Sequence, residues 1–182
     1  MPALHCASEV VADMRTVIGV MGGGTASEVV IAHARRIGHL VAENGWVLLN
    51  GGRDAGVMAA SAQGASEAGG LVVGILPSSD WDCIASGVDV AILTGMGDAR
   101  NAVNVLSSRV VIALPGGAGT LSEIALALKG GRPVITVGFP LGDEFASYRE
   151  AGRLIESDTP EDAITHTKQL LERELGSGSP WH

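Results

Sequence analysis

The chain has 182 residues, of which 46% are hydrophobic, and a formal net charge of -8. This length fits one domain, and the apolar content excludes intrinsic disorder, which combines low hydrophobicity with high charge. The acidic balance argues against a nucleic-acid partner, because no basic face is available to displace counterions. Uncharged stretches are too short for a membrane span, and the acidic residues Glu9 and Asp13 do not fit a signal peptide. We therefore expect a cytoplasmic protein with no nucleic-acid or membrane partner.

Strand-like and helix-like segments alternate along residues 16–175, which we predict to form a single domain between a flexible lead-in (1–15) and a flexible tail (176–182). In chain order, the predicted elements are a strand Thr16–Met21, a helix from about Ser27 to Asn44, a strand Trp46–Leu49, a helix from the loop Asn50–Gly56 through Ala68, strands Leu71–Leu76 and Val88–Leu93, a helix Ala99–Ser108, a strand Val110–Leu114, a helix Leu121–Lys129, a strand Pro133–Val137 and a helix Pro160–Leu175. The strands are continuously apolar, which is typical of parallel strands covered on both faces. The pattern predicts a doubly wound, mostly parallel α/β sheet of Rossmann-like type.

Two glycine-rich turns, residues 22–28 and 117–123, share the pattern G-x-G-T-x-S-E. Each follows an apolar strand and precedes a helix, so we expect two equivalent turns at the carboxyl edge of the sheet, where ligands bind in open α/β sheets. Such turns offer backbone N–H groups and the positive end of a helix dipole to an anion. The alternative is structural, with Thr-x-x-Glu acting as a capping box. Glycine density favours anion binding at residues 115–120, while both interpretations stay open for the first turn.

Common nucleotide and cofactor motifs are absent from the sequence. Ser27 or Ser122 replaces the third glycine of G-x-G-x-x-G, and no G-K-[ST] phosphate loop occurs. The only lysines, Lys129 and Lys168, come late in helices and offer no obvious Schiff-base site. Neither the five histidines nor the two cysteines have the spacing of metal ligands, so we expect no metal held by side chains.

Charged residues after other strands add candidates at the same edge. Arg100 begins a helix, where a cation opposes the helix dipole, so a pocket role is more natural than a structural one, with a solvated surface arginine as the alternative. Arg53 and Asp54 lie in a glycine-bracketed loop and either line a pocket or are exposed turn charges. Residues 78–82 fit either a lid or an ordinary surface loop.

Residues 115–123, Pro-Gly-Gly-Ala-Gly-Thr-Leu-Ser-Glu, match in full the P-G-G-x-G-T-x-x-E motif of the LOG-like, Rossmann-type superfamily, often mislabelled "lysine decarboxylase-like". The resemblance runs from about residue 16 to 175. The cytokinin-activating phosphoribohydrolases of this superfamily carry M-H-x-R-K ahead of the motif and use its arginine and the motif glutamate. This chain keeps Arg100 and Glu123 but replaces the Met-His pair by Gly-Asp and the lysine by Asn101.

The sequence Ala99-Arg100-Asn101, together with Gly-Gly-Arg-Asp-Ala-Gly-Val-Met at residues 51–58, more closely resembles the molybdenum-cofactor carrier branch of the superfamily. Members of that branch bind a phosphorylated pterin at the same glycine-rich edge and carry it without chemistry. Pro115, in contrast, is a feature of the enzymes. The motifs therefore favour the carrier branch without excluding the hydrolases.

The resemblance implies, first, a binding or carrier protein for a small phosphorylated cofactor, the molybdenum cofactor of molybdopterin type. The alternative is a phosphoribohydrolase that cleaves the N-glycosidic bond of a nucleoside 5'-monophosphate (AMP or a cytokinin riboside monophosphate), with Arg100 and Glu123 as catalytic residues. A nucleotide sensor without catalysis is a third hypothesis. The family also implies a homodimer or higher homo-oligomer. The expected ligand-binding residues are Gly22, Gly23, Gly24, Gly51, Gly52, Arg53, Arg100, Asn101, Gly116, Gly117, Gly119 and Thr120.

Overall fold

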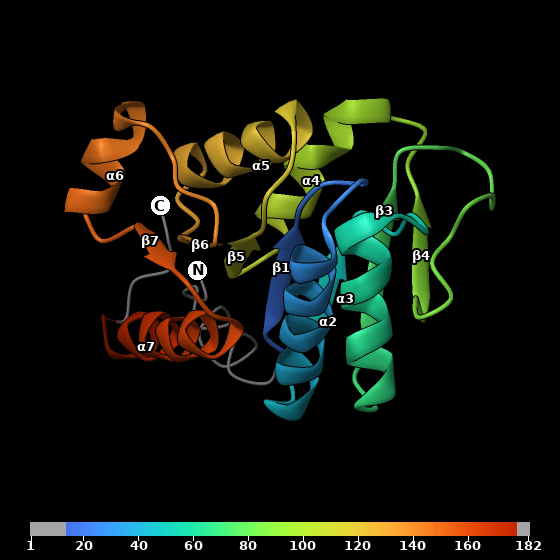
Figure 1. Ribbon diagram of the computed structural model, residues 1–182, viewed down its shortest axis with the longest axis horizontal. Coiled ribbons are helices and arrows are strands. Elements are labelled where there is room, and N and C mark those ends of the chain that lie inside the picture. Colours follow the sequence, from blue (N-terminus) through green and yellow to red (C-terminus); the bar gives the residue numbers. More distant parts are fainter. Residues whose placement is uncertain (1–13, 178–182) are drawn as a thin grey trace, which may run out of the picture.

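The structure, a computed structural model, describes residues 14–177 and contains one sheet of seven parallel strands in the order β4-β3-β2-β1-β5-β6-β7 (Figure 1). The strands are β1 (Val17–Met21), β2 (Val47–Asn50), β3 (Val72–Leu76), β4 (Val90–Leu93), β5 (Val110–Ala113), β6 (Val134–Val137) and β7 (Leu154–Ser157). Every neighbouring pair in the sheet is parallel. The predicted Rossmann-like, doubly wound sheet is confirmed.

Helices cover both faces of the sheet, and Figure 1 shows α2, α3 and α7 grouped on one side and α4 and α5 on the other. Their bounds are α2 (Glu28–Glu43), α3 (Gly56–Glu67), α4 (Arg100–Leu106, after a single 3-10 turn at Gly97–Ala99), α5 (Ala118–Lys129), α6 (Ala146–Glu150) and α7 (Pro160–Ser177). Two buried apolar clusters fill the layers between helices and sheet. The continuous apolar character of the inner strands follows from this two-sided cover.

Several elements differ from the sequence-based predictions. Strand β7 and helix α6 were not predicted, because Leu154-Ile155-Glu156-Ser157 carries only two apolar residues and lies at a sheet edge, where one side is partly exposed. Strand β4 is the other edge and is not covered on both faces: Val90 and Ile92 are 45% and 44% exposed. Helix α7 extends to Ser177, two residues into the expected tail, while residues 1–13 and 178–182 lie outside the described residues.

The strand order reverses direction at β1, which pairs with β2 on one side and β5 on the other. The chain therefore moves outward in opposite directions after β1 and after β5, and a crevice opens between their carboxyl ends. Register pairs Met21 with Ala113, the last residues of the two strands. Just beyond them, the Gly23 N–H donates to the Pro115 carbonyl at 3.1 Å and fixes the two following loops against each other.

Candidate ligand-binding site

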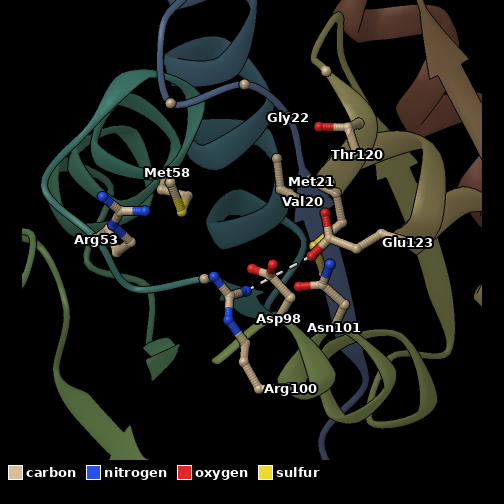
Figure 2. Close-up of a pocket in the computed structure, with 15 residues that line it drawn as sticks. Val20, Met21, Gly22, Arg53, Met58, Asp98, Arg100, Asn101, Thr120 and Glu123 are labelled. Atoms are coloured by element: carbon tan, nitrogen blue, oxygen red, sulfur yellow. Dashed lines mark ion pairs between the residues drawn. The ribbon is translucent and has the colours of Figure 1, made fainter. Parts of the chain in front are cut away.

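A pocket of about 200 Å³ lies at these carboxyl ends, where ligands bind in sheets of this topology. Figure 2 shows side chains converging on it from α4, from α5 and from the loop after β2. The lining residues are Val20, Met21, Gly22, Gly23, Gly24, Gly51, Arg53, Met58, Asp98, Arg100, Asn101, Gly117, Gly119, Thr120 and Glu123. All of the residues expected to bind ligand are among them except Gly52 and Gly116, whereas Val20, Met21, Met58 and Asp98 were not predicted.

The first turn of α5 forms one wall of the pocket. Gly117, the residue before the helix, has no side chain that could cap it. The N–H groups of the first turn therefore have no hydrogen-bond partner within the helix. A Cβ placed on Gly117 or Gly119 would meet nothing within 4 Å, and neither residue has a positive φ. Neither packing nor backbone conformation therefore requires glycine there. Other glycines with equally open surroundings have a positive φ that explains them: Gly45, Gly69, Gly97, Gly138 and Gly152.

The two turns that share G-x-G-T-x-S-E are not structurally equivalent, contrary to the prediction. Helix α5 begins at Ala118, the second residue of the pattern, whereas α2 begins at Glu28, the seventh. Ser27 caps α2 by accepting a hydrogen bond from the Val30 N–H at 3.4 Å, so the Thr-x-x-Glu capping box of the structural alternative does not form there. The equivalent serine, Ser122, lies inside α5 and donates to the Gly119 carbonyl at 2.7 Å.

The glycine-rich turn at residues 22–28 stays extended because its backbone is hydrogen-bonded to neighbouring elements. The Gly23 carbonyl accepts from the Val57 N–H at 3.0 Å, and the Gly23 N–H donates to Pro115. A Cβ on Gly22 would lie 2.7 Å from a Val57 methyl, so close packing against α3 requires glycine there. This turn therefore supports the pocket, while the turn at residues 117–123 leaves the N-terminus of α5 open to the pocket.

Gly52 and Gly116 are glycines for structural reasons and do not line the pocket. Gly52 has a φ of +70° and packs against Gly74, whose Cα would lie 3.0 Å from an added Cβ. An added Cβ on Gly116 would lie 2.2 Å from the Thr120 hydroxyl and 2.8 Å from the Gly23 nitrogen. Their assignment as ligand-binding residues stays a prediction, because the sequence shows where glycine occurs but not what its missing side chain would touch.

Arg100, Asn104 and Glu123 form a buried polar cluster at the base of the pocket. Arg100 Nη1 lies 3.7 Å from Glu123 Oε1 (dashed in Figure 2), and Asn104 Nδ2 donates to the same oxygen at 2.9 Å. Arg100 is 8% exposed and Glu123 is 6% exposed. Burial raises the pKa of Glu123, opposed by the Asn104 hydrogen bond and the Arg100 charge. Glu123 thus faces the pocket and does not cap α5.

Arg100 is held beside the backbone with unused hydrogen-bonding capacity. A Cβ on Gly51 would lie 2.7 Å from Arg100 Nη1, so the missing side chain makes room for the guanidinium. Arg100 Nε is buried without a hydrogen-bond partner among residues 14–177. Desolvation lowers the pKa of Arg100, while the Glu123 carboxylate raises it and the nearby Arg53 charge lowers it. An unpaired buried donor of this kind is costly.

The charges that line the pocket are Arg53, Asp98, Arg100 and Glu123, two of each sign. Asn101 also lines it and donates from Nδ2 to the Ser122 hydroxyl at 2.9 Å. Asp54 and residues 78–82 do not line the pocket. The loop after β3 nevertheless joins the loop after β2, since the Asp54 N–H donates to the Cys83 carbonyl at 2.7 Å.

Sequence reasoning missed Asn104, which is fully buried and fixes the Glu123 carboxylate. A signal was present, because Asn104 comes four residues after Arg100 and residues at this spacing share one helix face. Within residues 14–177, no group of three or more His, Cys, Asp or Glu side chains could hold a metal ion. No helix in that part of the chain has the length and apolar character to cross a membrane.

Comparison with known proteins gives a consistent family. The model of the SLOG cluster4 family matches residues 15–164. An uncharacterized protein of Archaeoglobus fulgidus is 46% identical over 149 residues, which cover 82% of this chain and 92% of that protein. The structure of a molybdenum cofactor binding protein from Rippkaea orientalis is 44% identical with a TM-score of 0.82, covering 87% of this chain and 99% of that one. The molybdenum cofactor carrier protein of Chlamydomonas reinhardtii is 41% identical with a TM-score of 0.80 and the same coverage.

Proposed function

The chain belongs to the SLOG cluster4 family, and from this premise and the pocket geometry we propose that it is a binding and carrier protein for the molybdenum cofactor. The observation that carries the proposal is the open wall at Gly117 and Gly119, where neither packing nor backbone conformation requires glycine. Two structural relatives above 40% identity are described as a molybdenum cofactor binding protein and a carrier protein. Both lines of support point to a phosphorylated ligand.

The pocket residues fit the phosphate end of such a cofactor. The uncapped first turn of α5, with Gly117, Gly119 and Thr120, offers N–H donors and the helix dipole to the phosphate. Arg100 supplies a mostly buried cation that lines the pocket, and Arg53 adds a second cation at the pocket wall. At about 200 Å³ the pocket has room for a phosphate and the atoms next to it, so the rest of a larger cofactor would extend through its mouth.

A second function, hydrolysis of a nucleoside 5'-monophosphate, is favoured by one observation. Arg100 and Glu123, the two residues that the phosphoribohydrolase branch uses, lie together inside the pocket with Nη1 and Oε1 3.7 Å apart. In that reaction Arg100 would orient the substrate, and Glu123 would stabilise positive charge that develops on the sugar. Prolonged incubation of AMP at high protein concentration separates the two functions, because only a hydrolase releases adenine.

The phosphate site is tested by thermal unfolding with and without inorganic phosphate or AMP. Ligand binding to the folded state raises the melting temperature, and Gly117→Asp should abolish the rise by placing a carboxylate in the open wall. The matched control is Leu121→Asp, which puts the same charge on an exposed position of α5 that does not line the pocket. An unchanged rise in Gly117→Asp would place the anion elsewhere. The carried cofactor itself is tested by the mass and absorbance of the molecule that co-purifies with the protein.

A further inference from the structure

The Glu123 carboxyl group has contacts that are not needed for an anion to bind at the N-terminus of α5 and Arg100. Both of its contacts fall on one oxygen: Asn104 Nδ2 donates to Oε1 at 2.9 Å, and Arg100 Nη1 lies 3.7 Å from the same atom. Oε2 makes no hydrogen bond within residues 14–177, although the side chain is only 8% exposed. The carboxyl group is therefore fixed in place with one oxygen left for the pocket.

This carboxyl group lies on the same helix as the proposed phosphate site. Glu123 follows Gly119 by four residues and Thr120 by three, and residues at these spacings share one face of a helix. All three line the pocket. An anion at the first turn of α5 consequently lies within about one helical turn of the Glu123 carboxyl group.

The other charges facing the pocket do not cancel the electrostatic repulsion between the Glu123 carboxylate and a bound anion. Arg100 on α4 and Arg53 after β2 are balanced by Asp98 and Glu123, so the lining has no net positive charge while Glu123 is ionised. Burial already raises the pKa of Glu123 in the free protein. An anion placed beside it disfavours the ionised form further.

We propose that Glu123 is a neutral carboxylic acid in the ligand-bound state, so that the pocket takes up one proton from solvent with each anion. The proton resides on Oε2, where the O–H donates to an oxygen of the bound anion, while Oε1 keeps its bond from Asn104. Protonation also leaves Arg100 free to pair with the ligand and gives the lining a net positive charge. The inference rests on the proposed function only in that the pocket binds an anion. It assigns Glu123 a binding role that requires no catalysis.

The pH dependence follows from this coupling. Affinity is highest and constant below the pKa of Glu123 in the free protein. It falls up to about tenfold per pH unit above that value, and levels off above the higher pKa of the bound state. Phosphate and AMP titrate in the same range, so the probe is sulfate, an anion of similar shape that does not titrate between about pH 5 and 8.

The test is titration calorimetry of sulfate at several pH values, in buffers that differ in ionisation enthalpy and therefore report proton uptake. The wild type should take up as much as one proton per sulfate bound. Glu123→Gln, whose amide oxygen can still accept from Asn104, should take up none and bind sulfate about tenfold or more tightly at pH 8. The control, Asp98→Asn, removes the other acidic charge of the lining, which acts on Arg100 electrostatically but forms no ion pair with it, and should retain the uptake.

Each outcome decides between the ideas. Sulfate binding to the wild type with no proton uptake across this pH range would overturn the inference and leave the anion site intact. Loss of uptake in Asp98→Asn, or uptake retained in Glu123→Gln, would assign the proton to another group and also overturn it. Absence of sulfate binding in the wild type and both variants would refute the anion site of the proposed function, and this inference with it.

Discussion

Replacing Gly119 by alanine should make the free protein more stable and the ligand complex weaker. Gly119 is the second residue of α5, has no positive φ, and an added Cβ would meet nothing within 4 Å. Glycine is about 1 kcal/mol less favourable than alanine inside a helix, and about half of that is expected in the first turn. For a chain of this size, this corresponds to a rise in melting temperature of about 1–2 °C.

The same methyl group would project into the pocket where the anion must approach the helix N–H groups. Losing one charge-assisted hydrogen bond costs about 1.5–3 kcal/mol, so sulfate or phosphate affinity should fall about tenfold to a hundredfold. Thermal unfolding with and without the anion measures both effects on one sample.

The matched control for Gly119→Ala is Gly64→Ala in α3, where the substitution is chemically identical. There an added Cβ would lie 1.9 Å from the Arg35 carbonyl oxygen, so α2 and α3 would have to separate. We expect a loss of about 1–3 kcal/mol of stability from this overpacking, with the anion-induced shift retained. A lower melting temperature in Gly119→Ala, or an unchanged response to anion, would refute the argument that the pocket requires glycine at this position.

Three further predictions concern the buried cluster. In the ligand-free protein, Glu123→Gln should have the same free energy of unfolding as the wild type at low pH and become relatively more stable as pH rises from about 4.5. The reason is that the raised pKa of Glu123 makes the wild type lose stability as pH rises above the pKa of the unfolded chain. Urea unfolding at several pH values measures this difference. Arg100→Ala should weaken sulfate binding at least about tenfold and raise the pKa of Glu123 further, which calorimetry across pH would detect. Asn104→Ala should cost about 1–3 kcal/mol of unfolding free energy, because Glu123 loses its donor; the absence of this cost in the Glu123→Ala background would confirm that the bond is responsible.

The sequence predicted the fold well where hydrophobicity alone decides the element. Inner strands such as β1 and β5 are apolar on both faces, and glycines mark the loops at their carboxyl ends. Edge elements were less predictable, because β7 needs apolar residues on one side only and α6 has five residues. Strand β4 shows the converse: its apolar residues suggested two-sided cover, yet two of them are exposed at the edge. The hydrophobic pattern of a sequence shows which residues are apolar but not which other elements pack against them.

The candidate site was predictable at the level of loops and less so at the level of single residues. Parallel topology brings the carboxyl ends of β1 and β5 together, so the glycine-rich turns and Arg100 could be assigned to one pocket. Whether a given glycine faces ligand or protein depends on long-range packing, as Gly116 against Thr120 shows. The role of Asn104 depends on α4 lying beside α5, which no local pattern specifies.

The two copies of G-x-G-T-x-S-E show how the same residues acquire different roles. In the first copy the Ser27 hydroxyl accepts from one N–H of α2 and so provides a side-chain cap for its own helix. In the second copy the helix starts five residues earlier in the pattern, so Gly117 occupies the position before the helix and offers no capping side chain. The helix end that lacks an internal cap is the one beside Arg100 and the open glycines. The proposed anion site therefore lies at the helix end without a side-chain cap, while the first copy is hydrogen-bonded to the loop that precedes α5 through the Gly23 N–H and the Pro115 carbonyl.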